Sequence, residues 1–334
     1  MLGVDTLGEI ANADWPLFGW IDDIRAPLSA ARASGRSCAL ATLHRVEGSA
    51  PRGPGAQMLF TALADGSIEA SGYFSGDCIE GDVAHHAAQV LEDGRPRQLH
   101  YGQGSPWIDI RLRCGGALYV MVERVPADCP AVADLLRHAA ERRPCRWHSD
   151  GVTRRVTLDD GPLLETTAEP FSLIRRFDPP RRLIVSGGDP GALAAAQLGA
   201  LARFETVLVR PDGPASLPPF PLARYIRARP TDAVAELGID RWTAYLGATH
   251  EDHHDLGGCL SALRGGAAWV GMIGAKSRTE GRMAALRALG ASEDELARLH
   301  LSPGVIGLGK SPFEVATGII AQIMQAMNPA AERA

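Results

Sequence analysis

The chain has 334 residues, with 34 Lys and Arg against 39 Asp and Glu, and so carries a formal net charge of −5. This balance argues against an electrostatic nucleic-acid binder, because such proteins usually carry a basic stripe. No apolar stretch approaches the ~20 residues that a membrane span requires, and the acidic start of the chain does not resemble a signal peptide. We therefore expect a cytoplasmic globular protein, and the length predicts about two domains.

The six cysteines, at positions 38, 78, 114, 129, 145 and 259, include no Cys-x-x-Cys pair. Their spacing argues against a zinc ribbon and against an iron–sulfur cluster. Without a secretory signal, a disulfide framework is not expected either.

Alternating apolar residues bounded by glycines predict strands in the first half of the chain. We expect strands over 37–47, 56–61, 108–112 and Ala117–Val125, and a hairpin turn at Asp65-Gly66. The Gly- and Pro-rich loop GSAPRGPG, at 48–55, joins the first two strands and carries one cation, Arg52. Apolar residues at helical spacing from Ile79 to Leu91 predict a helix that ends at Gly94.

The pattern changes near residues 178–182, after a segment rich in Arg and Pro at 126–180. Beyond it, short apolar strands alternate with longer helices, which indicates βαβ units and a parallel sheet. The predicted fold class is α/β. An amino-terminal mixed α+β domain with a linker covers residues 1–178, and a Rossmann-like parallel-sheet domain covers 179–330.

The segment LIVSGGDPGALAAA stands where a Rossmann fold has its phosphate loop. The pattern G-x-G-x-x-G begins here with Ser186, so its first glycine is missing, while Gly188 is retained. Asp189 is expected to cap the next helix with its own carboxylate, and Pro190 removes an amide donor. Arg210, at the end of the second strand, would tolerate a 2′-phosphate, which favours NADP over NAD.

Two further loops follow strands predicted in this half. In the first, His250 and His254 are four residues apart, so on a helix they would share a face and hold a metal. The alternative is an acidic helix start with solvated histidines. In the second, Lys276 and Arg278 would bind a phosphate near Gly188, unless the loop is solvated.

Cys78 and Cys114 have unusual neighbours. Cys78 lies at the start of the predicted helix, where Ser75 or Asp77 can act as cap, and Glu80 follows in its first turn. Cys114 closes a strand just before Gly115-Gly116, which would bend the backbone and expose the thiol. Both thiols would suit molybdenum or a sulfur-bearing ligand, or both are core cysteines.

Three stretches, GSAPRGPGAQMLF, SGDCIEGDV and CGGALYVMVE, in this order and spacing, resemble the amino-terminal domain of the XdhC/CoxI family. The stretches LIVSGGDPGALAAA, WVGMIGAKSR and FEVATGIIAQI resemble the Rossmann domain of that family. The resemblance covers most of the chain, from about residue 37 to residue 327.

The resemblance implies an accessory protein for molybdenum hydroxylases such as xanthine dehydrogenase. Such a protein binds the molybdenum cofactor (molybdopterin), protects it while a cysteine desulfurase supplies its terminal sulfur, and delivers it to the apo-enzyme. It further implies a homodimer, and a cofactor-insertion role rather than catalysis. Cys78 and Cys114 would then lie near the molybdenum, and the other expected cofactor contacts are Arg52, Gly55, Glu80, Gly115, Gly116, Gly188, Arg210, Lys276 and Arg278.

Two alternatives remain open from the sequence. One is an NADP-dependent oxidoreductase, or another small-molecule enzyme on this scaffold, with Arg210 beside the cofactor in a pocket between the domains. The other is a metal-dependent lyase or hydrolase that uses His250, His253 or His254. A serine hydrolase is poorly supported, since no G-x-S-x-G motif is present.

Overall fold

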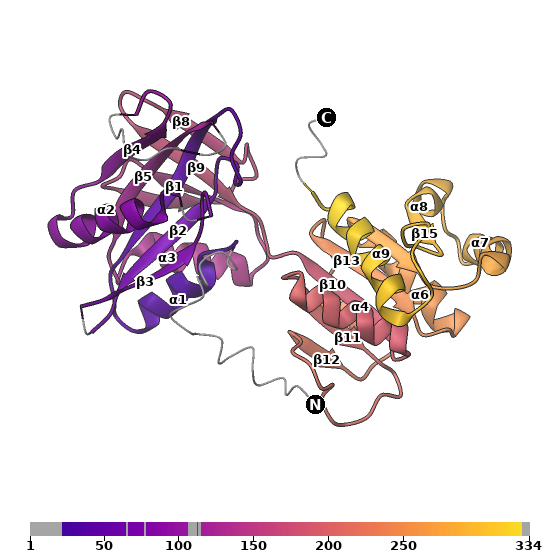
Figure 1. Ribbon diagram of the computed structural model, residues 1–334. Coiled ribbons are helices and arrows are strands. Elements are labelled where there is room, and N and C mark those ends of the chain that lie inside the picture. The colour runs from indigo at the N-terminus through magenta and orange to yellow at the C-terminus, as the bar shows by residue number, and fades with distance from the viewer. Residues whose placement is uncertain (1–21, 65, 77, 106–111, 113–114, 329–334) are drawn as a thin grey trace. The chain divides into compact units, whose positions relative to one another are not determined.

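The computed structural model describes residues 22–64, 66–76, 78–105, 112 and 115–328 (Figure 1). The chain divides into two compact units, the amino-terminal unit Met1–Pro179 and the carboxyl-terminal unit Pro180–Ala334. Among the described residues, no helix is both long enough and apolar enough to cross a membrane.

The amino-terminal unit is built on a five-stranded antiparallel sheet. Its strands are β1 (Cys38–Glu47), β2 (Gln57–Ala62), β3 (Ile68–Gly72), β4 (Arg97–Gly102) and β5 (Ala117–Val125), in the order β3-β2-β1-β5-β4. β1, β2 and β5 correspond to predicted strands, and β2 and β3 form the predicted hairpin. The turn residue Asp65 and the predicted strand 108–112, apart from Leu112, lie outside the described residues.

Helix α2 (Glu80–Asp93) covers one face of this sheet (Figure 1). Its apolar stripe, with Val83, Ala87 and Val90 fully buried, packs against alternate residues of β1 and β5. The helix ends as predicted at Gly94, which has φ of 71° and so adopts the left-handed conformation that glycine favours.

The other face of the sheet packs on elements that the sequence pattern does not predict. They are α1 (Arg25–Ala33), α3 (Pro130–Ala140) and a four-stranded antiparallel sheet of β6 (Cys145–Ser149), β7 (Arg154–Thr157), β8 (Leu164–Thr167) and β9 (Ser172–Phe177). Arginines occupy sites in this sheet where a strand normally buries apolar residues, and Arg146 is buried. The apolar alternation that identifies a strand is therefore weak between 126 and 180.

The carboxyl-terminal unit contains six parallel strands with helices on both faces (Figure 1). The strands are β10 (Arg182–Gly187), β11 (Glu205–Val209), β12 (Arg224–Ile226), β13 (Thr243–Ala248), β14 (Trp269–Met272) and β15 (Leu299–Leu301). Their order, β12-β11-β10-β13-β14-β15, is the 3-2-1-4-5-6 order of a Rossmann fold. The predicted parallel-sheet fold of this half is confirmed.

The helices of this unit bury two separate cores. α4 (Pro190–Leu201) and α9 (Pro312–Ala326) pack on one face of the sheet. The opposite face carries α5 (Pro230–Leu237), α6 (Asp252–Arg264), α7 (Thr279–Ala288) and α8 (Glu293–Ala297). The strand order reverses between β10 and β13, and open α/β sheets bind their ligands beyond the carboxyl ends of the strands at such a point.

Candidate functional site

The loop 48–55 lies against the glycines that precede β5. Ser49 and Gly115 form an isolated parallel bridge. A Cβ atom on Gly116 would lie 2.5 Å from the carbonyl oxygen of Ser49 and 2.7 Å from that of Glu47. Only a residue without a side chain fits so close to two backbone carbonyls, which is the physical reason for glycine here. Two of the motif loops therefore touch through their backbones.

The close approach at Gly116 predicts the effect of adding one methyl group. Gly116→Ala is expected to lower the free energy of unfolding of the amino-terminal unit by about 1–3 kcal/mol, the usual range for overpacking. Urea titration would measure this change. Gly53→Ala is the matched control, because a Cβ there meets no atom within 4 Å, and it should leave stability nearly unchanged. Equal effects of the two substitutions would contradict the contact.

Arg52 joins the loop 48–55 to the segment before α2. Its guanidinium lies over the ring of Tyr73, 4.7 Å from the ring centre, and it forms an ion pair with Asp22. The side chain keeps one-fifth of its surface exposed. A guanidinium held flat in this way offers its remaining donors as a planar fork, which suits phosphate or a pterin ring.

Glu80 organises the segment that carries Cys78. Its carboxylate is buried and accepts hydrogen bonds from four backbone N–H groups and one hydroxyl. The donors are the N–H groups of Phe74 (2.9 Å), Ser75 (2.6 Å), Gly76 (3.1 Å) and Ile79 (3.1 Å), and the Ser75 hydroxyl (2.5 Å). Burial alone would raise the pKa of Glu80, but the hydrogen bonds, led by those of Ser75, lower it to about 2. The carboxylate thus shapes this loop from inside.

Cys78 is the exposed cysteine among the described residues. It comes two residues before α2, and its N–H donates to the Ser75 hydroxyl oxygen at 2.9 Å, as does the N–H of Ile79 at 3.2 Å. The Ser75 hydroxyl therefore accepts hydrogen bonds from backbone N–H groups just before α2, as a helix cap does. The residue at the N-cap position itself, Ile79, makes no side-chain cap bond. The other candidate cap, Asp77, lies outside the described residues.

Cys114, the second predicted sulfur ligand, also lies outside the described residues, so its approach to Cys78 stays a prediction. The remaining cysteines are buried, as core residues are. Burial raises the pKa of the Cys38 thiol to about 12 and that of Cys145 to about 11, which keeps both as neutral thiols.

Arg175 is a contact of the loop 48–55 that the sequence does not reveal. Its Nε donates to the carbonyl oxygen of Gly55 at 2.7 Å, and its guanidinium stacks over the ring of Phe177, 4.0 Å from the ring centre. Burial lowers the pKa of Arg175 to about 10, so the group remains a cation at neutral pH. β9 thereby holds Gly55, whose φ of 94° marks the turn. A contact between residues 120 positions apart leaves no local sequence signal.

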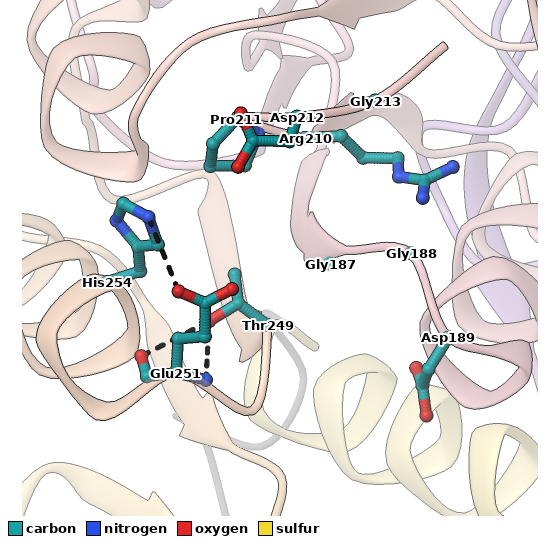
Figure 2. Close-up of a pocket in the computed structure, with 10 residues that line it drawn as sticks. All are labelled: Gly187, Gly188, Asp189, Arg210, Pro211, Asp212, Gly213, Thr249, Glu251 and His254. Carbon is teal, nitrogen blue, oxygen red and sulfur yellow. Dashed lines mark hydrogen bonds and ion pairs between the residues drawn. The ribbon is translucent and has the colours of Figure 1, made fainter.

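In the carboxyl-terminal unit, a cavity of about 210 Å³ opens at the ends of β10, β11 and β13 (Figure 2). A Cβ on Gly187 would lie 2.2 Å from the carbonyl oxygen of Ala248, so glycine is required where these strands meet. Arg210 lies across Gly188, where a Cβ would be 2.2 Å from Arg210 Nε. Gly188 and Arg210 both line the cavity, whereas Lys276 and Arg278 do not. Arg278 forms an ion pair with Asp252 at 2.6 Å.

Asp189 caps α4 as predicted. One carboxylate oxygen accepts from the N–H of Ala192 at 2.8 Å, and the other lies 3.1 Å from Nε2 of His250. The carboxylate thus occupies the helix start where a pyrophosphate would bind. With Arg210 lying over Gly188 as well, the geometry gives the NADP alternative no support.

Of the two interpretations of His250 and His254, the shared helix face is not found, and the segment instead leads into a helix with Asp252 and Asp255 in its first turn. His250 has φ of 63° and lies in the turn before α6, which begins at Asp252. His254 is instead grouped with Glu251 and His253, whose possible ligand atoms all lie within 4.8 Å of one another. A spacing argument assumes that both histidines lie on the helix. It cannot detect the left-handed conformation of His250, which is rare for a residue with a side chain.

Two family models match this chain. The model of the XdhC and CoxI family matches residues 31–102, and that of the XdhC Rossmann domain matches residues 183–323. Over 291 residues the chain is 26% identical to the molybdenum cofactor insertion chaperone PaoD of Escherichia coli K12, covering 87% of this chain and 83% of PaoD. Over 325 residues it is 26% identical to a Bacillus subtilis 168 protein named as a probable xanthine dehydrogenase subunit, covering 86% of this chain and 92% of that protein.

A solved structure also shares the fold. A Bacillus halodurans protein, described as a xanthine dehydrogenase, matches with a TM-score of 0.70 at 23% identity, over 92% of this chain and 98% of its own. At 23% identity, this similarity shows a shared fold and nothing about function.

Proposed function

Because the chain belongs to the XdhC/CoxI family, we propose that it binds the molybdenum cofactor as cargo and inserts it into a molybdenum hydroxylase of the xanthine dehydrogenase type. The relative PaoD, which is named as a molybdenum cofactor insertion chaperone, supports this role. In this proposal the chain is an accessory protein and not the catalyst.

We place the cargo at the loops of the amino-terminal unit. The observation that carries this assignment is that the loop 48–55 contacts Gly115-Gly116 through the backbone and, through Arg52, contacts Tyr73, two residues before the segment SGDCIEGDV. These loops offer a planar cation at Arg52, a glycine-lined backbone and an exposed thiol at Cys78. Such a set matches a cargo that combines a flat pterin, a phosphate and a soft, sulfur-liganded metal.

The finer assignments follow from the same site. Cys78 and Cys114 would supply sulfur close to the molybdenum, with Gly55, Gly115 and Gly116 lining its approach. Glu80 would act by shaping the loop, since its oxygens already accept five hydrogen bonds. We further propose that a cysteine desulfurase provides the terminal sulfur while the cofactor is held, and that the chain acts as a homodimer.

Cys78→Ala is expected to abolish most of the activation of a molybdenum hydroxylase apo-enzyme, because it removes the accessible soft ligand. The readout is the activity of the reconstituted target, together with molybdopterin retained by the chain, measured by mass spectrometry. Cys129→Ala, the same change at a buried thiol away from these loops, is the control. Full activation and full cofactor retention by Cys78→Ala would overturn the assignment of this thiol.

A further inference from the structure

Glu251, His253 and His254 gather at the start of α6 in the carboxyl-terminal unit. Nε2 of His253 lies 3.7 Å, and Nε2 of His254 lies 3.9 Å, from the same carboxylate oxygen of Glu251. The two imidazole ring centres are 4.0 Å apart. Two imidazoles and one carboxylate therefore converge outside the loops assigned to the cargo.

The turn that presents Glu251 is held from inside the protein. The fully buried carboxylate of Asp255 accepts hydrogen bonds from the N–H (3.0 Å) and hydroxyl (2.8 Å) of Thr249, and from the N–H of His250 (3.1 Å). The Thr249 hydroxyl oxygen in turn accepts from the N–H of Glu251 at 3.1 Å. These hydrogen bonds hold the backbone before α6, and so they position the Glu251 side chain beside the two histidines.

One side of this group faces the cavity at the strand ends. Glu251 and His254 both line that cavity, together with Asp212 from the loop after β11 (Figure 2). The side chain of His254 keeps only 15% of its surface exposed, whereas His253 and Glu251 are open to solvent. A ligand bound between the three side chains would therefore reach both solvent and the cavity.

The distances suit a small transition metal with little rearrangement. A tetrahedral ion with bonds of ~2.0–2.1 Å holds its ligand atoms about 3.4 Å apart, a few tenths of an ångström less than the two separations between Glu251 and the imidazoles, and all three ligand atoms lie within 4.8 Å of one another. Imidazole suits zinc, whereas calcium and magnesium require sets dominated by oxygen. The positive end of the α6 dipole opposes a cation here, but this effect is small beside the formation of three coordination bonds.

We propose that Glu251, His253 and His254 bind one divalent zinc-class ion, with a coordination position open towards the cavity. This metal site shares no residue with the loops assigned to the cargo. All three belong to the carboxyl-terminal unit, so failure of this proposal leaves the cargo assignment unaffected, and failure of the cargo assignment leaves the metal site in place.

The test is a calorimetric titration of the chelator-treated full chain with zinc chloride, paired with metal analysis after dialysis. We expect one zinc ion per chain, and we expect His253→Ala and His254→Ala each to weaken binding at least tenfold, the lower bound of about 10–100-fold for even an outer-shell partner. Thermal melting checks that both variants fold, which we expect because neither His253 nor His254 belongs to the buried core.

The matched control is His85→Ala. His85 also belongs to a pair of adjacent histidines on a helix, in which His86 contacts Asp82, and Nε2 of His85 lies 2.9 Å from Nε2 of Gln89. This variant should bind zinc as the unsubstituted chain does. Zinc binding that survives His253→Ala and His254→Ala, or that is lost in His85→Ala, would overturn the site.

Discussion

Replacing Glu80 with glutamine is expected to lower the free energy of unfolding of the amino-terminal unit by about 3 kcal/mol, because bonds to a charged acceptor are worth about 1.5–3 kcal/mol each. The buried carboxylate accepts five hydrogen bonds from residues 74–79, and the amide that replaces it lacks the charge and one acceptor oxygen. Faster hydrogen exchange in α2 and a lower urea midpoint would measure the change. We also expect weaker cofactor retention, since Glu80 shapes the loop that carries Cys78.

The pH dependence of this effect has a definite sign. The pKa of Glu80 is lowered from 4.5 to about 2, so its stabilising contribution is fully present above pH 4.5 and is lost as the pH falls toward 2. The difference between the unsubstituted chain and Glu80→Gln should therefore shrink in acid. Glu92→Gln, on the exposed side of the same helix, is the control and should be neutral. An equal loss in both variants would contradict this role of Glu80.

Replacing Arg154 with methionine is expected to destabilise the amino-terminal unit by about 3–5 kcal/mol, because it leaves a buried charge without its partner. Nε of Arg154 lies 2.5 Å from a carboxylate oxygen of Glu123, which also accepts from the Ser149 hydroxyl at 2.6 Å. Both members of the pair are almost completely buried. The bond joins β5 of the first sheet to β7 of the second. Urea titration followed by hydrogen exchange in β5 would measure the loss.

Acid should partly rescue the Arg154→Met variant. Burial raises the pKa of Glu123, an effect that Arg154 opposes in the unsubstituted chain. A carboxyl whose pKa is raised on folding stabilises the fold only when protonated, so the stability of the variant should increase as the pH falls through that pKa. The double change Glu123→Leu with Arg154→Met should recover most of the loss, since apolar replacement of a whole buried pair is often neutral.

The neighbouring residue provides the control for the ion pair. Arg155 follows in the same strand but is exposed, so Arg155→Met should change stability by less than about 0.5 kcal/mol. If Arg154→Met were as mild as Arg155→Met, the bond between the two sheets would not contribute to the stability of the unit.

Local patterns in the sequence predict the parts of this fold that depend on local chemistry. β1, β5, α2 and the alternating second half follow from apolar period and turn residues, and the Asp189 cap follows from its place before Pro190. β6 to β9 escape prediction because arginines that pair with distant carboxylates, such as Arg146 with Asp159, interrupt the apolar alternation. The three-residue strands β12 and β15 are too short to show a period.

The candidate site likewise has parts that the local sequence predicts and parts that it does not. The three motif segments are visible in the sequence, and glycine at positions 48 and 116 is explained by the backbone contact between them. The support given by Arg175 to Gly55 depends on tertiary contact alone. The Glu80 carboxylate instead turns inward to donors only one to six residues before it, a local contact that its place in the first turn of the helix does not predict. The proposed metal ligands at α6 exclude His250 because this left-handed residue lies before the helix, which a helical spacing argument does not anticipate.

Hydrogen exchange of the full chain with and without molybdopterin locates the cargo directly. Binding at the amino-terminal loops requires slower exchange in the loop 48–55 and in the segment that leads into α2, with no change around Gly188 and Thr249 of the other unit. Protection confined to the strand ends of β10 and β13, or no protection anywhere at saturating cofactor, would contradict the assignment of these loops.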